Sequence, residues 1–210
     1  MDQLESKIRA LQNRHRRIWY LADGVYSMFG DFAPMDDLVA LMDRHESLHC
    51  YVDDAHGMSW AGTHGQGLVR SLVPHHDKLV LAVSLNKSFA AAGGAIIFPN
   101  EEWRERARNC GGTMIFSGPI QPPMLGAAIA SAELHLSADF AGMLAELTDL
   151  VDYANTRMAD LGIPQFQVTR SPLFFVPVGL PRIVADLVHR MIDDGFYVNM
   201  ATFPATPMRR

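Results

Sequence analysis

Two short apolar runs, each followed by polar side chains, constrain the fold of this chain more than any other feature. Residues 51–52 precede Asp53 and, three positions further, His56, while residues 79–83 precede Lys87. Both runs are of the aliphatic and β-branched kind that parallel sheets bury. Functional groups of open α/β sheets lie at the carboxyl ends of the strands. The sequence therefore predicts a carboxylate, an imidazole and an amine at one edge of one sheet.

The rest of the sequence alternates between helix-like and strand-like segments. Some segments repeat apolar positions at helical spacing, and others are short runs of β-branched and aromatic residues. We expect helices at 2–17, 34–46, 101–109, 124–136, 140–161 and 181–193, and strands at 18–22, 48–52, 79–83, 95–98, 173–178 and 196–200. Strands that alternate with helices are typical of βαβ units, so the predicted fold class is α/β with a mostly parallel sheet.

The composition limits the kind of protein. With 210 residues and 49% hydrophobic content, the chain can form one sizeable core or one domain with an appendage. The net charge of -5 argues against nucleic acid as a partner. A polar N-terminus and the lack of a stretch of about 18 apolar residues predict a protein without a signal region or membrane span. Two cysteines, Cys50 and Cys110, form no disulfide framework, so we expect a cytoplasmic location.

The predicted sheet edge carries side chains with a joint chemical use. The amine of Lys87 can form a Schiff base, and the carboxylate of Asp53 can keep a pyridine nitrogen protonated. Ordinary roles compete with these. A lysine after a strand is commonly a solvated charge, and Asp53 and Asp54 can cap a helix or stabilise a turn.

The same region permits a metal interpretation. Asp53, His56 and His64 are ligands of the type that zinc or iron binds, and the pair His75-His76 follows nearby. Their spacings match no helical pair of ligands, and a metal leaves Lys87 unexplained. We therefore expect no metal site.

Four ordered motifs give the chain a family resemblance. They are DGVYSMFGDFAP at 23–34, VDDAHG at 52–57, SLNK at 84–87 and FSGPIQPP at 116–123. In this order they resemble the pyridoxal-phosphate enzymes of the class II aminotransferase family, which have fold type I. Within that family the chain looks like the α-oxoamine synthases, a group that includes 8-amino-7-oxononanoate synthase, glycine acetyltransferase and serine palmitoyltransferase.

The resemblance implies a role for each matched residue around pyridoxal 5'-phosphate. Lys87 matches the lysine that binds the cofactor covalently, and Asp53 matches the carboxylate that pairs with its ring nitrogen. His56 and Ser27 match residues near the phenolic oxygen of the ring, and Ser84 matches a phosphate contact. For Ser27 and Ser84, a local hydrogen bond within a turn is an equally open interpretation.

The resemblance also implies an activity and partners. These relatives are transferases that condense an amino acid with an acyl-CoA-type thioester, and transamination through the same lysine is the alternative. Ser117 and Gly118 match a segment that reaches the phosphate across a subunit interface, which implies a homodimer. Three positions depart from the family pattern, because Phe29 replaces a common acidic residue, Ser59 a usual glycine, and Asn86 a small residue before the lysine.

The resemblance covers only part of a family member. It implies that residues 1–165 form the C-terminal part of the cofactor-binding large domain and that 166–210 begin an incomplete small domain. The family's phosphate loop has no match here, so we expect a partial cofactor site with weak binding. The alternative function is therefore a truncated, catalytically incompetent remnant, or a split-enzyme partner of a full-length subunit. Arg209 and Arg210 are open candidates for the small-domain arginine that holds the substrate carboxylate.

Overall fold

The chain forms two compact units in the computed structural model, which describes residues 1–203 and 205–206. The first unit consists of Met1–Ser27 and Asp31–Asp149, and the second of Met28–Gly30 and the chain from Leu150 onward. The domain boundary expected near residue 165 stays a prediction. Arg209 and Arg210 lie outside the described residues.

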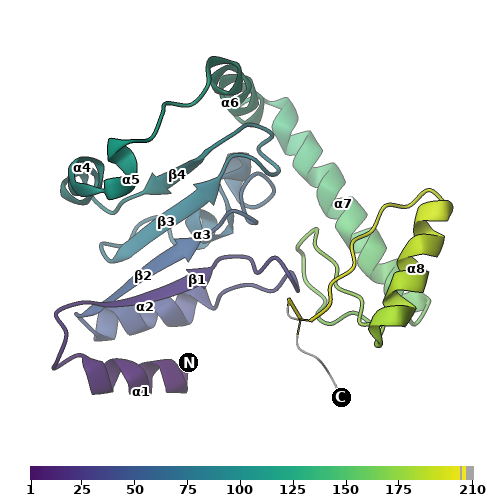
Figure 1. Cartoon of the computed structure of the whole chain (residues 1–210), viewed down its shortest axis with the longest axis horizontal. Helices are drawn as coiled ribbons and strands as arrows, with labels where there is room; N and C mark the ends of the chain where they lie inside the picture. Colours follow the sequence, from purple (N-terminus) through teal and green to yellow (C-terminus); the bar gives the residue numbers. More distant parts are fainter. Residues whose placement is uncertain (204, 207–210) are drawn as a thin grey trace. The chain divides into compact units, whose positions relative to one another are not determined.

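A four-stranded sheet forms the centre of the first unit (Figure 1). Its strands, in spatial order, are β1 (Ile18–Asp23), β2 (Leu48–Asp53), β3 (Leu79–Ser84) and β4 (Gly94–Ile97). The first three are parallel, and β4 is antiparallel to β3. Asp23 pairs with Asp53, and Asp53 pairs with Ala82, so the carboxyl ends of the parallel strands share one edge. The predicted α/β class with a mostly parallel sheet is confirmed.

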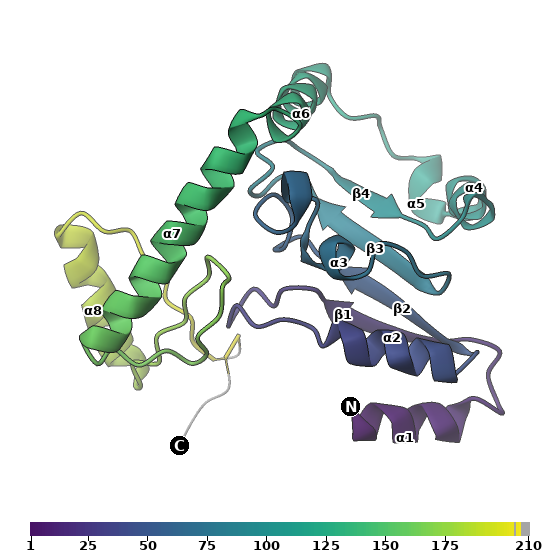
Figure 2. The same cartoon turned by 180° about the vertical axis from the view of Figure 1, so that it is seen from behind.

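Helices precede β1, connect β1 to β2 and β2 to β3, and continue the chain beyond β4, as the view from behind also shows (Figure 2). They are α1 (Asp2–Leu11), α2 (Met35–Arg44), the 3-10 helix η1 (Thr63–Gly65), α3 (Leu68–Leu72), α4 (Glu101–Cys110), α5 (Gly112–Ile115), α6 (Pro122–His135), α7 (Asp139–Asp160) and α8 (Pro181–Asp193). Helix α1 is shorter than the predicted 2–17, because Leu11 is its last apolar position and a polar, basic segment follows. Within the described residues, no helix is both long and apolar enough to cross a membrane.

One face of the sheet is buried under the helices of the first unit. Alternate side chains of β2 reach this face and pack with apolar residues of α1, α2 and α3. The fully buried members of this core include Ile8, Met35, Leu38, Leu41, Met42, Leu48, Cys50, Val52 and Val69. Burying one such aliphatic side chain stabilises the fold by about 1.5–3 kcal/mol. This layer therefore holds the strands, and the loops at their ends, in place.

Phe29 belongs to an aromatic cluster of the second unit. Its ring stacks on Phe166, with centroids 4.2 Å apart, and meets the edge of Phe175 at 5.0 Å. The adjacent Gly30 has a φ of +70°, and a Cβ added to it would lie 2.7 Å from the carbonyl oxygen of Leu173. The departure from the family's acidic residue at position 29 thus has a packing explanation.

Two expected strands do not form in the second unit. Residues 173–178 and 196–200 are irregular and join no β-ladder among the described residues. A strand is stable only when its backbone groups pair with a neighbour, and Pro172 and Pro177 have no N–H group to donate. The expectation of strands here is wrong, whereas α8 forms where it was predicted.

Ser59 has a backbone conformation that favours glycine, the residue usual at this position in the family. Its φ is +76°, and its backbone N–H donates to the carbonyl oxygen of Gly65 at 2.8 Å. The side chain is buried, and its Oγ has no hydrogen-bond partner among the described residues. A left-handed conformation costs a residue with a Cβ about 1–2 kcal/mol, so Ser59 is a strained position.

Replacing Ser59 by glycine is expected to raise the free energy of unfolding by about 1 kcal/mol. The change removes the strain and an unpaired buried hydroxyl, although the entropy of glycine in the unfolded chain offsets part of the gain. Urea unfolding of the wild type and Ser59→Gly measures the difference. Ser88→Gly, at an exposed position without positive φ, is the control and gains no stability. A less stable Ser59→Gly protein contradicts the prediction.

Candidate active site

Lys87 and His56 meet directly at the carboxyl edge of the sheet. Nζ of Lys87 lies 2.8 Å from Nε2 of His56. Burial of the imidazole and the positive charge of Lys87 lower the pKa of His56 below its ordinary value, while Asp23 and Asp53 oppose this shift. A neutral imidazole accepts the hydrogen bond that an ammonium group donates. The geometry of the pair is therefore that of a hydrogen bond from the amine to the neutral ring.

The loop between β3 and β4 holds Lys87 in place. The Ala90 N–H donates to the carbonyl oxygen of Lys87 at 2.8 Å. Phe89 is buried with its ring centroid 4.8 Å from that of His135, and the hydroxyl of Ser131 donates to the Phe89 carbonyl oxygen at 2.6 Å. Helix α6 thus anchors the loop two residues after the amine.

Asp53 ends β2 at the same edge of the sheet. Its carboxylate is exposed, and Oδ1 accepts a hydrogen bond from the Ala55 N–H at 2.9 Å. This bond shapes the start of the turn that carries His56. Because the charge of Asp53 acts on the pKa of His56, the two side chains share one electrostatic environment.

Asp54, in contrast, is completely buried. Its Oδ2 accepts a hydrogen bond from the Val69 N–H at 2.9 Å, near the start of α3, and its Oδ1 has no partner among the described residues. Burial raises the pKa of Asp54 to about 6, against the opposing effect of hydrogen bonds from the backbone of Val69 and Leu68. Of the two neighbouring carboxylates, only Asp53 is open to a ligand.

The predicted hydroxyl contacts lie at different places. Ser27 is exposed in the loop after β1, and the hydroxyl of Ser84 donates to Oδ1 of Asn86 beside Lys87. Ser84 therefore makes the local hydrogen bond that its position in a turn suggested. Residues 117–118 are exposed in the connection between α5 and α6, and a Cβ added to Gly118 would meet no atom within 4 Å.

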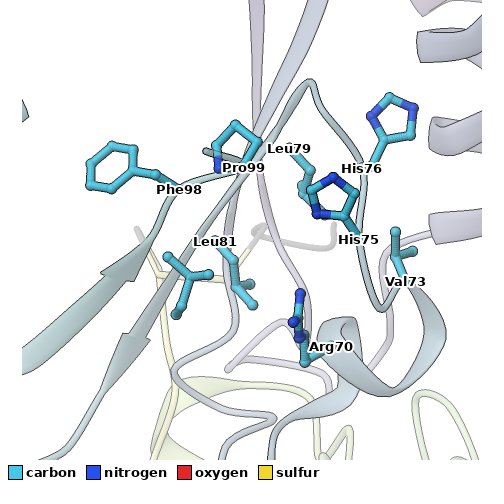
Figure 3. Close-up of a pocket in the computed structure, with 9 residues that line it drawn as sticks. Arg70, Val73, His75, His76, Leu79, Leu81, Phe98 and Pro99 are labelled. Atoms are coloured by element: carbon cyan, nitrogen blue, oxygen red, sulfur yellow. The ribbon is translucent and has the colours of Figure 1, made fainter. Parts of the chain in front are cut away.

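The histidines of the metal interpretation have other partners. His64 Nδ1 lies 2.9 Å from the carbonyl oxygen of His135, and His75 pairs with Asp77 at 2.9 Å. The described residues hold no group of three or more His, Cys, Asp or Glu side chains placed to share a metal ion. His75 and His76 line a pocket at the opposite end of β3 from the lysine loop (Figure 3). Its volume of about 20 Å³ suits one water molecule and is too small for a cofactor.

The residues at the sheet edge fit pyridoxal phosphate chemically. Lys87 offers a primary amine for a covalent bond, Asp53 an exposed carboxylate for the ring nitrogen, and His56 a proton acceptor 2.8 Å from the amine. Ser27 and Ser84 bring hydroxyl groups to the ends of β1 and β3. Together these residues provide the amine, carboxylate, imidazole and hydroxyl groups with which one edge of a sheet can hold such a cofactor.

The anchor of the lysine loop was not foreseen from the sequence. Ser131 and Phe89 are 42 residues apart, and their hydrogen bond follows from tertiary packing. Ser131 lies in an alanine-rich helical segment, where nothing marks it as different from its neighbours. One signal in the sequence was Phe89, a large aromatic residue in a loop of mostly small and polar residues.

The fold and the residues at the carboxyl edge of its sheet together define an α/β protein with an amine-bearing site at the ends of parallel strands. The profile of the family described as Aminotransferase class I and II matches residues 1–209. The chain belongs to the class I and II aminotransferase family, which is pyridoxal-phosphate-dependent.

Individual relatives place the chain near one group of this family. The 8-amino-7-oxononanoate synthase of Alkaliphilus oremlandii is 28% identical over 207 residues, which make up 99% of this chain and 51% of the relative. A serine palmitoyltransferase structure from Sphingomonas wittichii has a TM-score of 0.81 at 23% identity and covers 97% of this chain and 51% of its own. For the 8-amino-7-oxononanoate synthase structure from Francisella tularensis, the TM-score is 0.76 at 19% identity, with 94% and 58% covered.

These similarities confirm two predictions, the resemblance to the α-oxoamine synthase group and the partial fold type I architecture. The chain spans about half the length of the curated relatives it matches. The solved structures share the fold of this chain.

The raised pKa of Asp54 predicts a pH-dependent stability. Because its folded pKa of about 6 lies above the value of an unfolded aspartate, the native state binds the proton more tightly. The contribution of Asp54 to the free energy of unfolding should fall as the pH rises from about 4 to about 6, by on the order of 3 kcal/mol, and stay level above that.

Urea unfolding of the wild type and of Asp54→Asn between pH 4 and pH 7 tests this dependence. The difference between the two proteins should change across the window, because asparagine does not titrate. Parallel pH profiles would show that Asp54 keeps an ordinary pKa in the folded protein.

Proposed function

We propose that this chain is part of a pyridoxal-phosphate-dependent transferase and that Lys87 binds the cofactor covalently. The observation that carries the proposal is the 2.8 Å contact between Lys87 Nζ and His56 Nε2, at the edge where β2 ends in Asp53. Family membership supports it. The proposed reaction is the condensation of an amino acid with an acyl-CoA-type thioester.

Lys87 acts as the nucleophile of this site. Its amine attacks a carbonyl only after it has lost a proton, and Nε2 of His56 lies within hydrogen-bond distance of that proton. The lowered pKa of His56 favours the neutral ring, which is the form that accepts a hydrogen bond from the amine. His56 therefore orients the amine of Lys87 for reaction.

Asp53 serves as the counter-charge for the ring nitrogen. When bound, the cofactor supplies an electron sink for a carbanion at the α carbon of the amino acid. A carboxylate beside the ring nitrogen favours its protonated form, and the exposed carboxylate of Asp53 is accessible for this pairing. The Ala55 N–H orients the carboxylate through Oδ1.

Hydroxyl groups and a second subunit complete the proposed site. Ser27 would hold the phenolic oxygen of the ring, and Ser84 would hold the phosphate through the hydroxyl that here donates to Asn86. Ser117 and Gly118 reach the phosphate of the neighbouring subunit in a homodimer, for which their exposure leaves them available. A cytoplasmic location is consistent with the unpaired cysteines.

Acyl transfer is preferred over transamination because of the named relatives, which are 8-amino-7-oxononanoate synthases and serine palmitoyltransferases. Both reactions begin at the same lysine. They differ in their products, since acyl transfer releases the free thiol of the acyl donor and transamination releases a 2-oxo acid. Assays for these two products with one amino acid and one acyl-CoA separate the alternatives.

Incubation with pyridoxal phosphate followed by borohydride reduction should label Lys87. The chain has three lysines, so peptide mapping is decisive. Lys78 donates to the carbonyl oxygens of Met42 and His45 and is not available, whereas Lys7 lies exposed on α1. Lys87→Ala should abolish the label and Lys7→Ala should leave it, while Asp53→Asn should keep the bond but remove turnover. Label on another lysine, or none, contradicts the proposal.

A second candidate function, that of a subunit active only with a partner polypeptide, has a specific observation in its favour. The face of the sheet opposite the core has an apolar groove of about 550 Å³ next to α4. Trp19 and Leu21 of β1 lie in it with 41% and 68% of their surface exposed. Parallel sheets are normally covered on both faces. In this candidate function, a partner chain that completes the domain covers the groove.

Co-expression with a full-length relative tests the partner candidate. A complex should co-purify, and Leu21→Glu should weaken it because a charge would be buried in an apolar interface. Glu102→Gln, at the rim of the same groove, is the matched control with little expected effect. If the isolated chain is a monomer with full turnover by sedimentation and assay, this candidate is wrong.

A further inference from the structure

The carboxylate of Asp54 lies against three glycines from separate parts of the loop region. A Cβ added to Gly24, Gly57 or Gly67 would lie 2.5, 2.1 or 2.4 Å from an oxygen of Asp54. Real Cβ contacts are not this short, so a side chain at any of these positions would displace the carboxylate. We call Gly24, Gly57 and Gly67 the glycine nest of Asp54.

The glycine nest joins the segments that carry the proposed site. Gly24 directly follows β1 and precedes Ser27, Gly57 directly follows His56, and Gly67 precedes α3. One buried carboxylate therefore lies close to the backbone of each segment. A displacement of this carboxylate acts on all three segments.

The backbone of Asp54 is fixed as well. Its N–H donates to the carbonyl oxygen of Ala82 in β3 at 2.8 Å, and its own carbonyl accepts from the N–H groups of Gly57 and Met58 at 3.0 Å each. His56 lies inside the turn that these bonds close. The position of its ring relative to Lys87 therefore depends on the turn that begins at Asp54.

We propose that Asp54 is a positioning residue whose buried carboxylate holds the 54–58 turn in the conformation that presents His56 Nε2 to Lys87 Nζ. An acid with one oxygen that is unpaired among the described residues costs stability in the interior, so a neutral residue of similar size would be more stable there. Despite this cost, the carboxylate contributes its position against the glycine nest, next to all three loop segments. The importance of the His56–Lys87 contact for reaction rests on the proposed function.

The pKa of His56, followed by NMR in the cofactor-free protein, tests the positioning role. In Asp54→Asn the imidazole should leave its partly buried place beside Lys87, and its pKa should rise toward the ordinary value of histidine. Loss of the negative charge of Asp54 alone shifts this pKa downward, so the two explanations have opposite signs. The His56 signal is assigned with His56→Gln, and Asp77→Asn, an exposed carboxylate, is the control without effect.

Gly57→Ala provides a second route to the same displacement and covers the case in which Asp54→Asn does not fold. All three atoms nearest to its added Cβ belong to the carboxyl group of Asp54, and Gly57 has no positive φ. The substitution should raise the pKa of His56 when it is made in the wild type. It should have little further effect when it is combined with Asp54→Ala. Gly126→Ala in α6, where an added Cβ meets nothing within 4 Å, is the control.

The rate of Lys87 labelling by pyridoxal phosphate tests whether the 54–58 turn controls the reactivity of the lysine. Asp54→Asn and Gly57→Ala should slow labelling several-fold without moving the label to another lysine. An unchanged or lowered pKa of His56 in both variants, whether their thermal stability rises or falls, would show that Asp54 is merely structural. Failure of the proposed function has a different signature, because the wild-type protein then carries no label on Lys87.

Discussion

The parallel register of β1, β2 and β3 is the constraint on which the rest of the structure depends. Asp23 pairs with Asp53 and Asp53 with Ala82, so these strands end within a few residues of one another. Every loop that leaves this edge begins from a fixed point, and the helices packed on the buried face prevent the strands from slipping. The 2.8 Å contact between His56 and Lys87, which are 31 residues apart, is a consequence of that register.

Two adjacent carboxylates at the end of β2 have opposite environments. Asp53 is exposed and Asp54 completely buried, because successive side chains of a strand point to opposite sides. The exposed carboxylate remains in contact with water and open to a ligand. Its buried neighbour loses hydration, which raises its pKa, and its oxygens contact glycine backbone and the start of α3. Asp53 is thus accessible to a ligand, while Asp54 holds the surrounding loop in place.

Much of the fold could be predicted from local patterns, and the site only in part. The runs at 48–52 and 79–83 are strongly apolar, so β2 and β3 were foreseen, and their carboxyl ends located Asp53 and Lys87. Residues 173–178 look like a strand locally, but strand formation requires a partner that no local pattern specifies. The contacts of Phe89 with Ser131 and of Asp54 with the glycine nest arise from tertiary packing and leave no periodic signal. Phe29 and Ser59 both depart from the family pattern. Ring packing gives a local reason for Phe29, whereas the positive φ of Ser59 favours the family's glycine, and the structure does not explain the serine.

The two candidate functions use different parts of the sheet, one a face and the other the carboxyl edge. The apolar groove lies over the middle of the strands beside α4, where Tyr51 and Val80 contribute to its lining. The lysine loop instead follows the carboxyl end of β3. Hydrophobic burial is proportional to the apolar area removed from water and is insensitive to single charges at a distance. A partner that covers the groove can therefore bind whether or not Lys87 carries a cofactor, whereas reaction at Lys87 depends on the turn that holds His56.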